Sequence, residues 1–232
     1  RGRPLLYALL PYQVSAVAAA GTALFNFNGG TLKATSANAG ANFMTSANID
    51  GVYVYGNGGT IDDNGTAITI SRPLLAPTGN GVSSITVADG GSGYVGAPMV
   101  SITGGTGGPA TAVANMVDDG TGNWTFKVGS ITITSPGVYT VDPTTVTLTG
   151  GGPAMAASGF TIATAANTSG GLTKVGAGTL TAGTLNGIGS LSVTAGAFAS
   201  TGTVTGAGAV ADGAAFGAGA FGTVGTLTFG GA

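Results

Sequence analysis

The sequence predicts an all-β fold, in which a parallel β-solenoid (β-helix) is interrupted by an inserted, internally duplicated antiparallel β module. Three observations lead to this prediction. The composition is rich in Gly, Thr and Val and poor in strong helix formers other than Ala and Leu. Bulky apolar residues recur about every six positions in the C-terminal part. A middle region holds two copies of one pattern of short strands and glycine-rich turns.

The composition indicates a folded, turn-rich chain. Glycine accounts for 46 of the 232 residues, and Glu is absent, so that all eight acidic residues are Asp. Only 6% of the residues are charged, but 43% are hydrophobic, and the mean hydropathy is +0.43. A chain of low charge and high hydrophobicity collapses rather than staying disordered.

The pattern divides the chain into four parts: an apolar N-terminal segment (residues 1–21), a first solenoid part (22–79), the duplicated insert (80–167) and a second solenoid part (168–232). The N-terminal segment has two arginines, an apolar run and then small residues, which is also the layout of a signal peptide. Pro4 and Pro11 interrupt the run, which makes a membrane helix a poor fit. We favour an extended apolar segment that can be donated as a strand to a neighbouring copy.

The second solenoid part carries the six-residue period, which is the length of one side of a three-sided β-solenoid. Glycines between the bulky residues suit corners, where a positive φ is often needed. With about 18 residues per coil, three columns are expected: Leu180, Phe198 and Phe216; Leu185, Val204 and Phe221; and Leu191, Val210 and Leu227. These nine residues are the predicted solenoid core. The alternative is a low-complexity Gly/Ala tail without fixed structure.

The first solenoid part alternates apolar and polar residues in short stretches, with Ile61, Ile68 and Ile70 as expected inward residues. The insert repeats residues 82–105 as residues 128–151, and its short connections favour antiparallel neighbours.

The pattern predicts positions for four aromatic residues of the insert. Tyr94 and Tyr139 occupy equivalent positions and are expected to pack against the following strand with their hydroxyls at the edge. Contact with a glycan is a second possibility for both. Trp124 and Phe126, between the copies, are expected in the core of the insert.

Residues 170–180, GGLTKVGAGTL, resemble the signature of the autotransporter-associated β-strand repeat, which occurs in passenger regions of large bacterial secreted proteins. Residues 27–35 and 57–79 look like the segment that precedes this signature, and residues 222–231 look like a recurring ending of the same proteins. The resemblance implies a parallel β-helix exported to the cell surface or beyond. The duplicated insert separates the signature from its usual lead-in.

The residue inventory excludes several kinds of chemistry. The chain has no His, so Ser-His-Asp triads, imidazole metal sites and the histidine base of hexapeptide-repeat acyltransferases are ruled out. It has no Cys, and therefore no disulfide or thiolate site. The net charge of −2 without a basic cluster argues against nucleic acid or an anionic membrane as partner.

Two polar features are candidate sites. Asp62, Asp63 and Asn64 form a weak candidate for Ca²⁺, although Asp-Asn-Gly sequences more often serve as turns. Lys174 lies in a glycine-rich run, but a phosphate-binding loop needs a following helix, and this run continues into a strand. Lys174 is therefore expected to be an exposed charge on a strand edge.

The sequence thus predicts a non-enzymatic structural or adhesive module of a bacterial extracellular or cell-surface protein. Its expected partner is a second copy of itself, bound head to tail in fibres through the solenoid ends and the N-terminal segment. No cofactor, nucleic acid or membrane span is expected. The alternative is a carbohydrate-binding surface module of a secreted adhesin, which would use exposed tyrosines; an enzyme is the weakest option.

Overall fold

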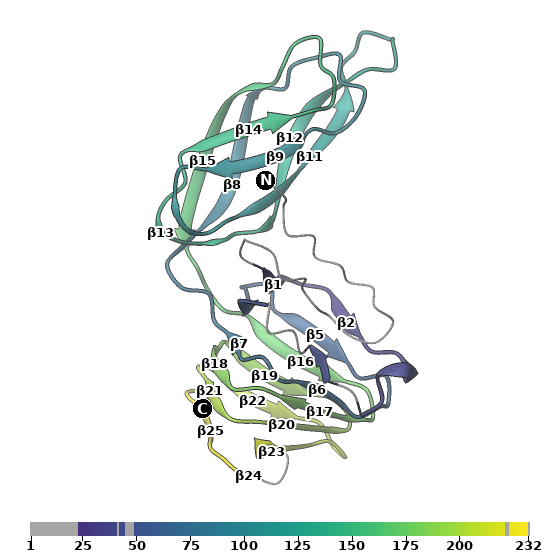
Figure 1. The fold of residues 1–232 in the computed structure, drawn as a ribbon, viewed down its shortest axis with the longest axis vertical. Helices are drawn as coiled ribbons and strands as arrows, with labels where there is room; N and C mark the ends of the chain where they lie inside the picture. The colour runs from purple at the N-terminus through teal and green to yellow at the C-terminus, as the bar shows by residue number, and fades with distance from the viewer. Residues whose placement is uncertain (1–22, 41, 45–48, 221–222, 232) are drawn as a thin grey trace. The chain divides into compact units, whose positions relative to one another are not determined.

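The computed structural model describes residues 23–40, 42–44, 49–220 and 223–231. Over these residues the chain is all-β, as predicted, with parallel sheets and one curled antiparallel sheet. A single 3₁₀ turn, η1 (Ser36–Asn38), is the one helical element described. The chain forms two compact units: Arg1–Pro77 with Thr168–Ala232 (unit 1), and Thr78–Asn167 (unit 2) (Figure 1). The donated segment predicted at residues 1–21, and Phe221, lie outside the described residues.

Unit 1 contains three sheets whose strands run parallel, except where β24 pairs with β23. The first sheet holds β1 (Leu24–Phe27), β4 (Gly51–Val54), β7 (Leu74–Leu75), β18 (Leu185–Ile188), β21 (Gly202–Val204) and β25 (Leu227–Phe229). The second holds β2 (Thr31–Lys33), β5 (Gly59–Asp62), β16 (Gly171–Val175), β19 (Ser190–Val193) and β22 (Gly208–Val210). The third holds β3 (Asn42–Met44), β6 (Ile68–Ile70), β17 (Thr179–Ala182), β20 (Ala197–Ser200), β23 (Ala215–Ala220) and β24 (Thr223–Val224).

The chain visits these three sheets in a fixed rotation, so that three consecutive strands make one round. The rotation runs first, second, third sheet from β1 to β7. It then resumes on the second sheet with β16, after unit 2. Strand β16 pairs directly with β5, and β17 with β6, in the same parallel arrangement as strands that follow one another closely in sequence. Unit 2 is therefore inserted between a strand of the first sheet and a strand of the second without breaking the rotation.

The interior of unit 1 is filled by one or two apolar residues from most of its strands. Ile68, Leu180, Phe198 and Phe216 are aligned on neighbouring strands of the third sheet, as the first predicted column requires. The predicted inward residues that are fully or almost fully buried are Ile61, Ile68, Ile70, Leu180, Leu185, Leu191, Phe198 and Val204. Parallel strands with in-register apolar residues give a continuous core along the sheets.

The other two predicted columns are wrong in register. Leu185 is aligned with Gly202, while Val204 is aligned with Ile188. Leu191 is aligned with Gly208, while Val210 is aligned with Val193. A count of 18 residues per coil fails because the turns differ in length and because β18 carries an irregularity between Asn186 and Ile188.

Three predicted core residues of the last round are less buried than expected. Val210 is 41% exposed and Phe216 37% exposed, and Leu227 is partly buried. Each is aligned with a strand of the preceding round, but no further round covers it within the described residues. The ring of Phe216 instead packs on Phe229, with centroids 5.3 Å apart.

Unit 2 is an antiparallel sheet with its own apolar core. Its strands are β8 (Asn80–Asp89), β9 (Met99–Thr103), β10 (Thr106–Gly108), β11 (Thr111–Asp118), β12 (Phe126–Ser135), β13 (Val138–Val141), β14 (Thr145–Thr149) and β15 (Ser158–Ala166). The order is β10-β13-β8-β12-β11-β9-β14, with β15 paired to β8. In the long strands, inward apolar residues alternate with outward hydroxyl and small residues.

The two copies of the duplication exchange strands around a pseudo-twofold axis. Equivalent strands pair with each other, Ile85 of β8 with Ile131 of β12 and Ser101 of β9 with Thr147 of β14. The last strand of each copy pairs with the first strand of the other copy, β15 with β8 and β11 with β12. Neither copy can therefore complete its own sheet alone.

Tyr94 and Tyr139 stabilise this strand exchange from within the core of unit 2. Both side chains are buried, and the Oη atom of Tyr94 accepts a hydrogen bond of 2.9 Å from the Ala157 N–H of the other copy. The Oη atom of Tyr139 accepts one of 2.7 Å from the Ala110 N–H, again across the copies. The prediction that these hydroxyls lie at the edge is wrong, because each is needed by a buried backbone donor at the start of a partner strand.

Replacement of Tyr94 by Phe is expected to lower the free energy of unfolding of unit 2 by about 1–3 kcal/mol, because the buried Ala157 N–H loses its acceptor. Tyr139→Phe should cost a similar amount by the pseudo-twofold relation. Denaturant unfolding followed by circular dichroism measures both. Tyr53→Phe, at a half-buried position of unit 1, is the matched control, and a cost for it equal to that of Tyr94→Phe would contradict this role.

Candidate functional site

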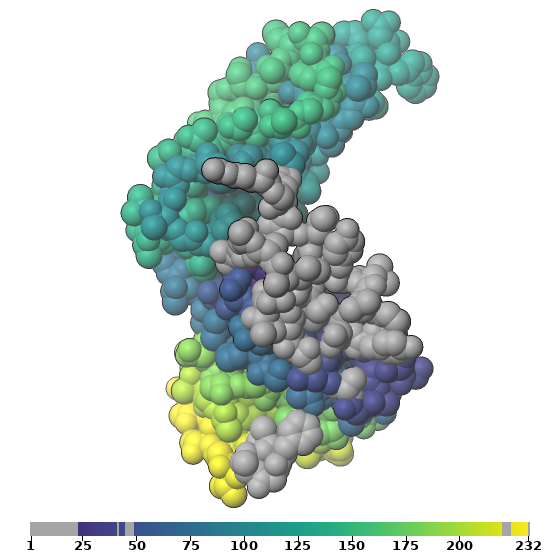
Figure 2. All heavy atoms as spheres, viewed as in Figure 1, coloured from purple at the N-terminus to yellow at the C-terminus, as the bar shows by residue number. Residues whose placement is uncertain are grey.

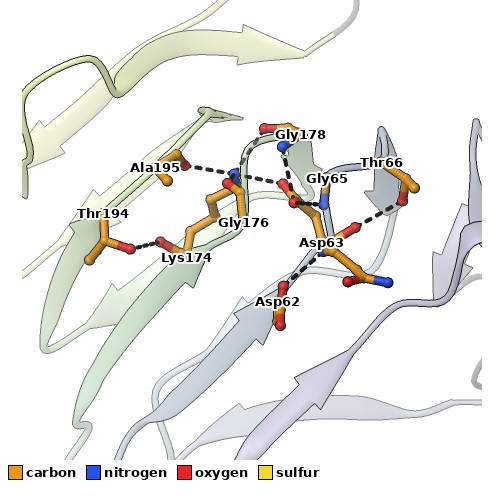
Figure 3. A network of polar contacts seen from close by, with 10 residues as sticks. Asp62, Asp63, Gly65, Thr66, Lys174, Gly176, Gly178, Thr194 and Ala195 are labelled. Carbon is orange, nitrogen blue, oxygen red and sulfur yellow. Dashed lines mark hydrogen bonds and ion pairs between the residues drawn. The ribbon is translucent and has the colours of Figure 1, made fainter.

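Residues 170–180, the stretch that carries the family resemblance, form β16, a tight turn and the start of β17. Leu172 and Leu180 are fully buried in the core of unit 1. Between them Lys174 points toward Asp63 (Figure 3) and is also fully buried, so that three residues of this stretch face the interior. The stretch therefore forms the first corner after the insert.

Lys174 is fully buried, which corrects the prediction of an exposed edge charge. Its Nζ atom lies 2.6 Å from Oδ2 of Asp63, whose side chain is also fully buried. Nζ further donates to the carbonyl oxygens of Gly176, Gly178 and Ala195 at 2.6, 2.8 and 2.7 Å. The inward direction follows from strand alternation, because Leu172 and Lys174 lie two positions apart on β16.

The Asp63 carboxylate is satisfied on its other side by backbone donors. Its Oδ1 atom accepts hydrogen bonds from the N–H groups of Gly65 at 2.9 Å and Gly178 at 3.1 Å. The Asp63 carbonyl accepts the N–H and the hydroxyl of Thr66. A buried charge pair is tolerated when most of its polar atoms are also bonded. Here the ammonium and Oδ1 have hydrogen-bond partners, whereas Oδ2 of Asp63 has only its ion-pair contact with Nζ.

The groups that contact Nζ of Lys174 lie in the turns that connect the second sheet to the third, in three consecutive rounds. Asp63 follows β5, Gly176 and Gly178 follow β16, and Ala195 follows β19. Asp63 and Gly178 are 115 positions apart in the sequence, and unit 2 lies between them. The Lys174 side chain therefore ties the round before the insert to the two rounds after it. We call Lys174, Asp63 and these carbonyl partners the corner clasp.

Two glycines of this stretch are required by close approach of the rounds. Gly176 has φ +91°, and a Cβ atom there would lie 2.2 Å from Oδ1 of Asp63. A Cβ atom on Gly178 would lie 2.1 Å from the Thr66 carbonyl oxygen. Any side chain at either position would therefore push the corner away from Asp63.

The weak Ca²⁺ candidate does not form a converging set of free oxygens. Asp62 pairs with Lys33 at 2.6 Å and accepts the Asn64 N–H, while Asp63 pairs with Lys174. The Lys33 ammonium, followed by the Asn64 N–H, holds the pKa of Asp62 below its ordinary value of 3.8. Over the described part of the chain no three His, Cys, Asp or Glu side chains gather as a metal site would need.

The glycan contact predicted for Tyr94 and Tyr139 is contradicted by their burial, since both rings lie in the core of unit 2. Trp124, expected in that core, is instead 90% exposed, in the loop between β11 and β12. Phe126, at the start of β12, is half-buried against the core and takes the inward position. The signal for an exposed tryptophan was its setting, DDGTGNWT, which consists of turn residues with no apolar neighbour.

Comparison with known proteins gives no family: no family model, curated protein or solved structure matches the chain. Among the described residues no helix is long and apolar enough to cross a membrane. The corner clasp is chemically a closed charge pair, because three carbonyl oxygens accept the three ammonium protons of Lys174 and the Asp63 carboxylate balances its charge.

Replacement of Lys174 by Met is expected to lower the free energy of unfolding by about 3–5 kcal/mol, because Asp63 is left as an unpaired buried carboxylate. Adding Asp63→Leu to Lys174→Met should recover part of that loss. The matched control is Lys33→Met, which breaks an exposed ion pair of the same 2.6 Å length and should cost about 0–1 kcal/mol. Denaturant unfolding measures both losses. Equal losses for the two lysine variants would show that the clasp contributes no more to stability than the exposed ion pair does.

Unit 2 is expected to lose stability in acid. The N–H groups of Gly93 and Thr121 lower the pKa of Asp119, and the Thr164 hydroxyl and Asn80 amide lower that of Asp142. A carboxyl whose pKa is lowered on folding stabilises the fold above the ordinary value of 3.8 and loses that effect as the pH falls toward the lowered value. The melting temperature should therefore be constant above about pH 5 and fall below about pH 4. Asp119→Asn with Asp142→Asn should show a smaller fall, and an equal fall would contradict the assignment.

Proposed function

We propose that the chain is a non-enzymatic structural and adhesive module of a bacterial extracellular or cell-surface protein, with unit 1 as a parallel β-solenoid. The single observation that supports this most is the unbroken rotation of strands through three parallel sheets, from β1 to β23. In a solenoid each round contacts only the rounds before and after it, and the backbone bonds run along the axis. Such a body supplies length and display rather than a reaction centre.

The corner clasp supports a structural role. Its two charges neutralise each other in the interior, where they are inaccessible to a substrate. Its partners are backbone groups of three rounds, so its effect is to hold rounds together. The absence of His and Glu from the sequence removes the usual acid–base groups.

Head-to-tail assembly of copies is the second part of the proposal. Within the described residues, β1 and β2 pair on one edge only, and so do β22 and β25 at the other end. Unpaired parallel edges can continue into another copy, and a contact between two different surfaces of one chain extends into a fibre. The exposed apolar surface of Val210 and Phe216 suits this stacking.

Electron microscopy of the concentrated, purified chain tests assembly. Filaments are expected, with a spacing of about 4.8 Å along the axis in fibre diffraction from the stacked rounds. Val210→Lys at the last round should prevent filaments and leave a folded monomer, because an inward-facing charge blocks the edge. Val95→Lys, at an exposed position of unit 2, is the matched control and should assemble normally.

Deletion of residues 1–21 tests whether the N-terminal segment contributes a donated strand. The shortened chain should fold but fail to assemble. If the shortened chain still forms filaments, the N-terminal segment does not donate a strand, and assembly occurs by end-to-end stacking alone. Monomers at every concentration, for the full chain, would refute self-assembly itself.

A further inference from the structure

The β11–β12 loop, residues 119–125, displays the sole tryptophan of the chain at one end of unit 2. At the opposite end of the module the chain enters at Asn80 and leaves at Ala166, which are aligned neighbours. Because β12 runs antiparallel to β8, its first residue, Phe126, lies at the far end of the strands. The loop projects beyond the strand ends in Figure 1, and in Figure 2 the teal atoms at the upper right form a knob.

The loop is held in one conformation by hydrogen bonds that leave the indole ring free of the core. Asp119 accepts the N–H groups of Gly93 at 2.9 Å and Thr121 at 3.0 Å, and the Thr121 hydroxyl at 2.8 Å. The Thr121 and Thr125 hydroxyls are bonded at 2.9 Å, and the Asp119 N–H donates to the Thr125 carbonyl. An ordered loop presents a side chain with little entropy to lose on binding.

The backbone of Trp124 is strained. Its φ is +56°, in the left-handed region, which a bulky residue adopts rarely, and in the described chain only Asn64 shares a positive φ among non-glycine residues. Trp124 is nonetheless 90% exposed and fills no core position. A strained conformation that gives no packing in return indicates a binding role.

We propose that this loop is a contact site for a neutral polysaccharide, with the Trp124 indole as the stacking platform and the Asp118 carboxylate as an acceptor for sugar hydroxyls. The apolar C–H face of a pyranose ring matches an exposed aromatic ring, whereas its hydroxyl groups need polar partners at the rim. The rim supplies them, because Asn123 and Thr125 flank Trp124 and Asp118 is exposed, with one carboxylate oxygen, Oδ1, already accepting the Gly120 N–H at 2.6 Å.

The charges of unit 2 favour a neutral ligand over an anionic one. Residues 78–167 contain Asp89, Asp118, Asp119 and Asp142 against a single basic residue, Lys127. Asp118 directly precedes the loop and Asp119 is its first residue, so an anionic polysaccharide or an anionic bilayer would be repelled. A bilayer would also require further apolar residues beside the tryptophan, and the loop has only Gly, Thr and Asn there.

Tryptophan fluorescence tests the proposal directly, because Trp124 is the single tryptophan in the sequence and therefore the source of all indole emission. Laminarin and hydroxyethyl cellulose are the neutral probes; alginate and phosphatidylglycerol vesicles are the anionic ones. A neutral probe is expected to shift the emission to shorter wavelength and to protect the indole from acrylamide quenching. Protection by vesicles or alginate but by neither neutral polymer would overturn the proposal, and so would no protection by any probe.

Variants separate binding from folding. Trp124→Ala is expected to weaken retention in a gel containing the neutral probe by at least about tenfold, the scale of one lost aromatic stacking contact. Trp124→Phe should retain part of the affinity. Val95→Ala, at another exposed apolar position of unit 2, should bind as the parent does. Unchanged retention of Trp124→Ala would contradict the site.

Trp124→Gly distinguishes a binding role from a structural one. Glycine adopts a positive φ without strain, so this variant should melt at or above the temperature of the parent and yet lose binding. A lower melting temperature would assign Trp124 to the fold and overturn the proposal. The site does not depend on self-assembly, since the filament assay and the fluorescence assay report on different units.

Discussion

The structure depends on one constraint, which is that the round before the insert and the round after it must align in register although unit 2 separates them in sequence. Strand β16 meets this requirement by pairing with β5, and the corner clasp closes the same corner from the inside. The hydrophobic effect alone would tolerate a shift along the strands, because it is non-directional. A buried charge pair does not, because a shifted Lys174 would leave Asp63 unpaired in the core. The clasp thus specifies register, whereas Leu172 and Leu180 supply cohesion.

This division of roles explains how unit 1 accommodates a large insertion. The rotation passes from β7 to β16 as it would through a short corner, so the insert lengthens a connection and leaves the ladders intact. Unit 2 in turn needs nothing from unit 1 for its core, since its exchanged strands and the Tyr94 and Tyr139 hydrogen bonds complete it internally. Because a loop of any length costs entropy only logarithmically, two such bodies can share one chain at modest cost.

Sequence reasoning reached the all-β class, with parallel sheets and an antiparallel one, and the alignment of Leu180 with Phe198, because both rest on local periodicity. It could not predict the burial of Lys174, since lysine is almost never fully buried without a partner, and the partner lies across the insert. It also failed in two columns, because turn lengths are set by backbone detail, such as the irregularity at Ile188, that composition does not encode. The strand exchange in unit 2 could not be predicted for a similar reason. A duplicated sequence specifies two equivalent sets of strands, but it does not say whether a strand pairs within its own copy or with the other copy.

The misplacement of Trp124 shows where the usual rule for large aromatic residues fails in unit 2. A default rule places large aromatic residues inside, and in unit 2 it holds for Tyr94 and Tyr139, whose hydroxyls accept buried N–H groups. The same two positions cannot serve a ligand for that reason. Trp124 has no such internal partner role, because its side chain stands in solvent while Asp119 and Thr121 hold its loop. The two tyrosines that the sequence offered as a possible glycan contact hold the module together, and the tryptophan that it assigned to the core is the residue exposed to solvent.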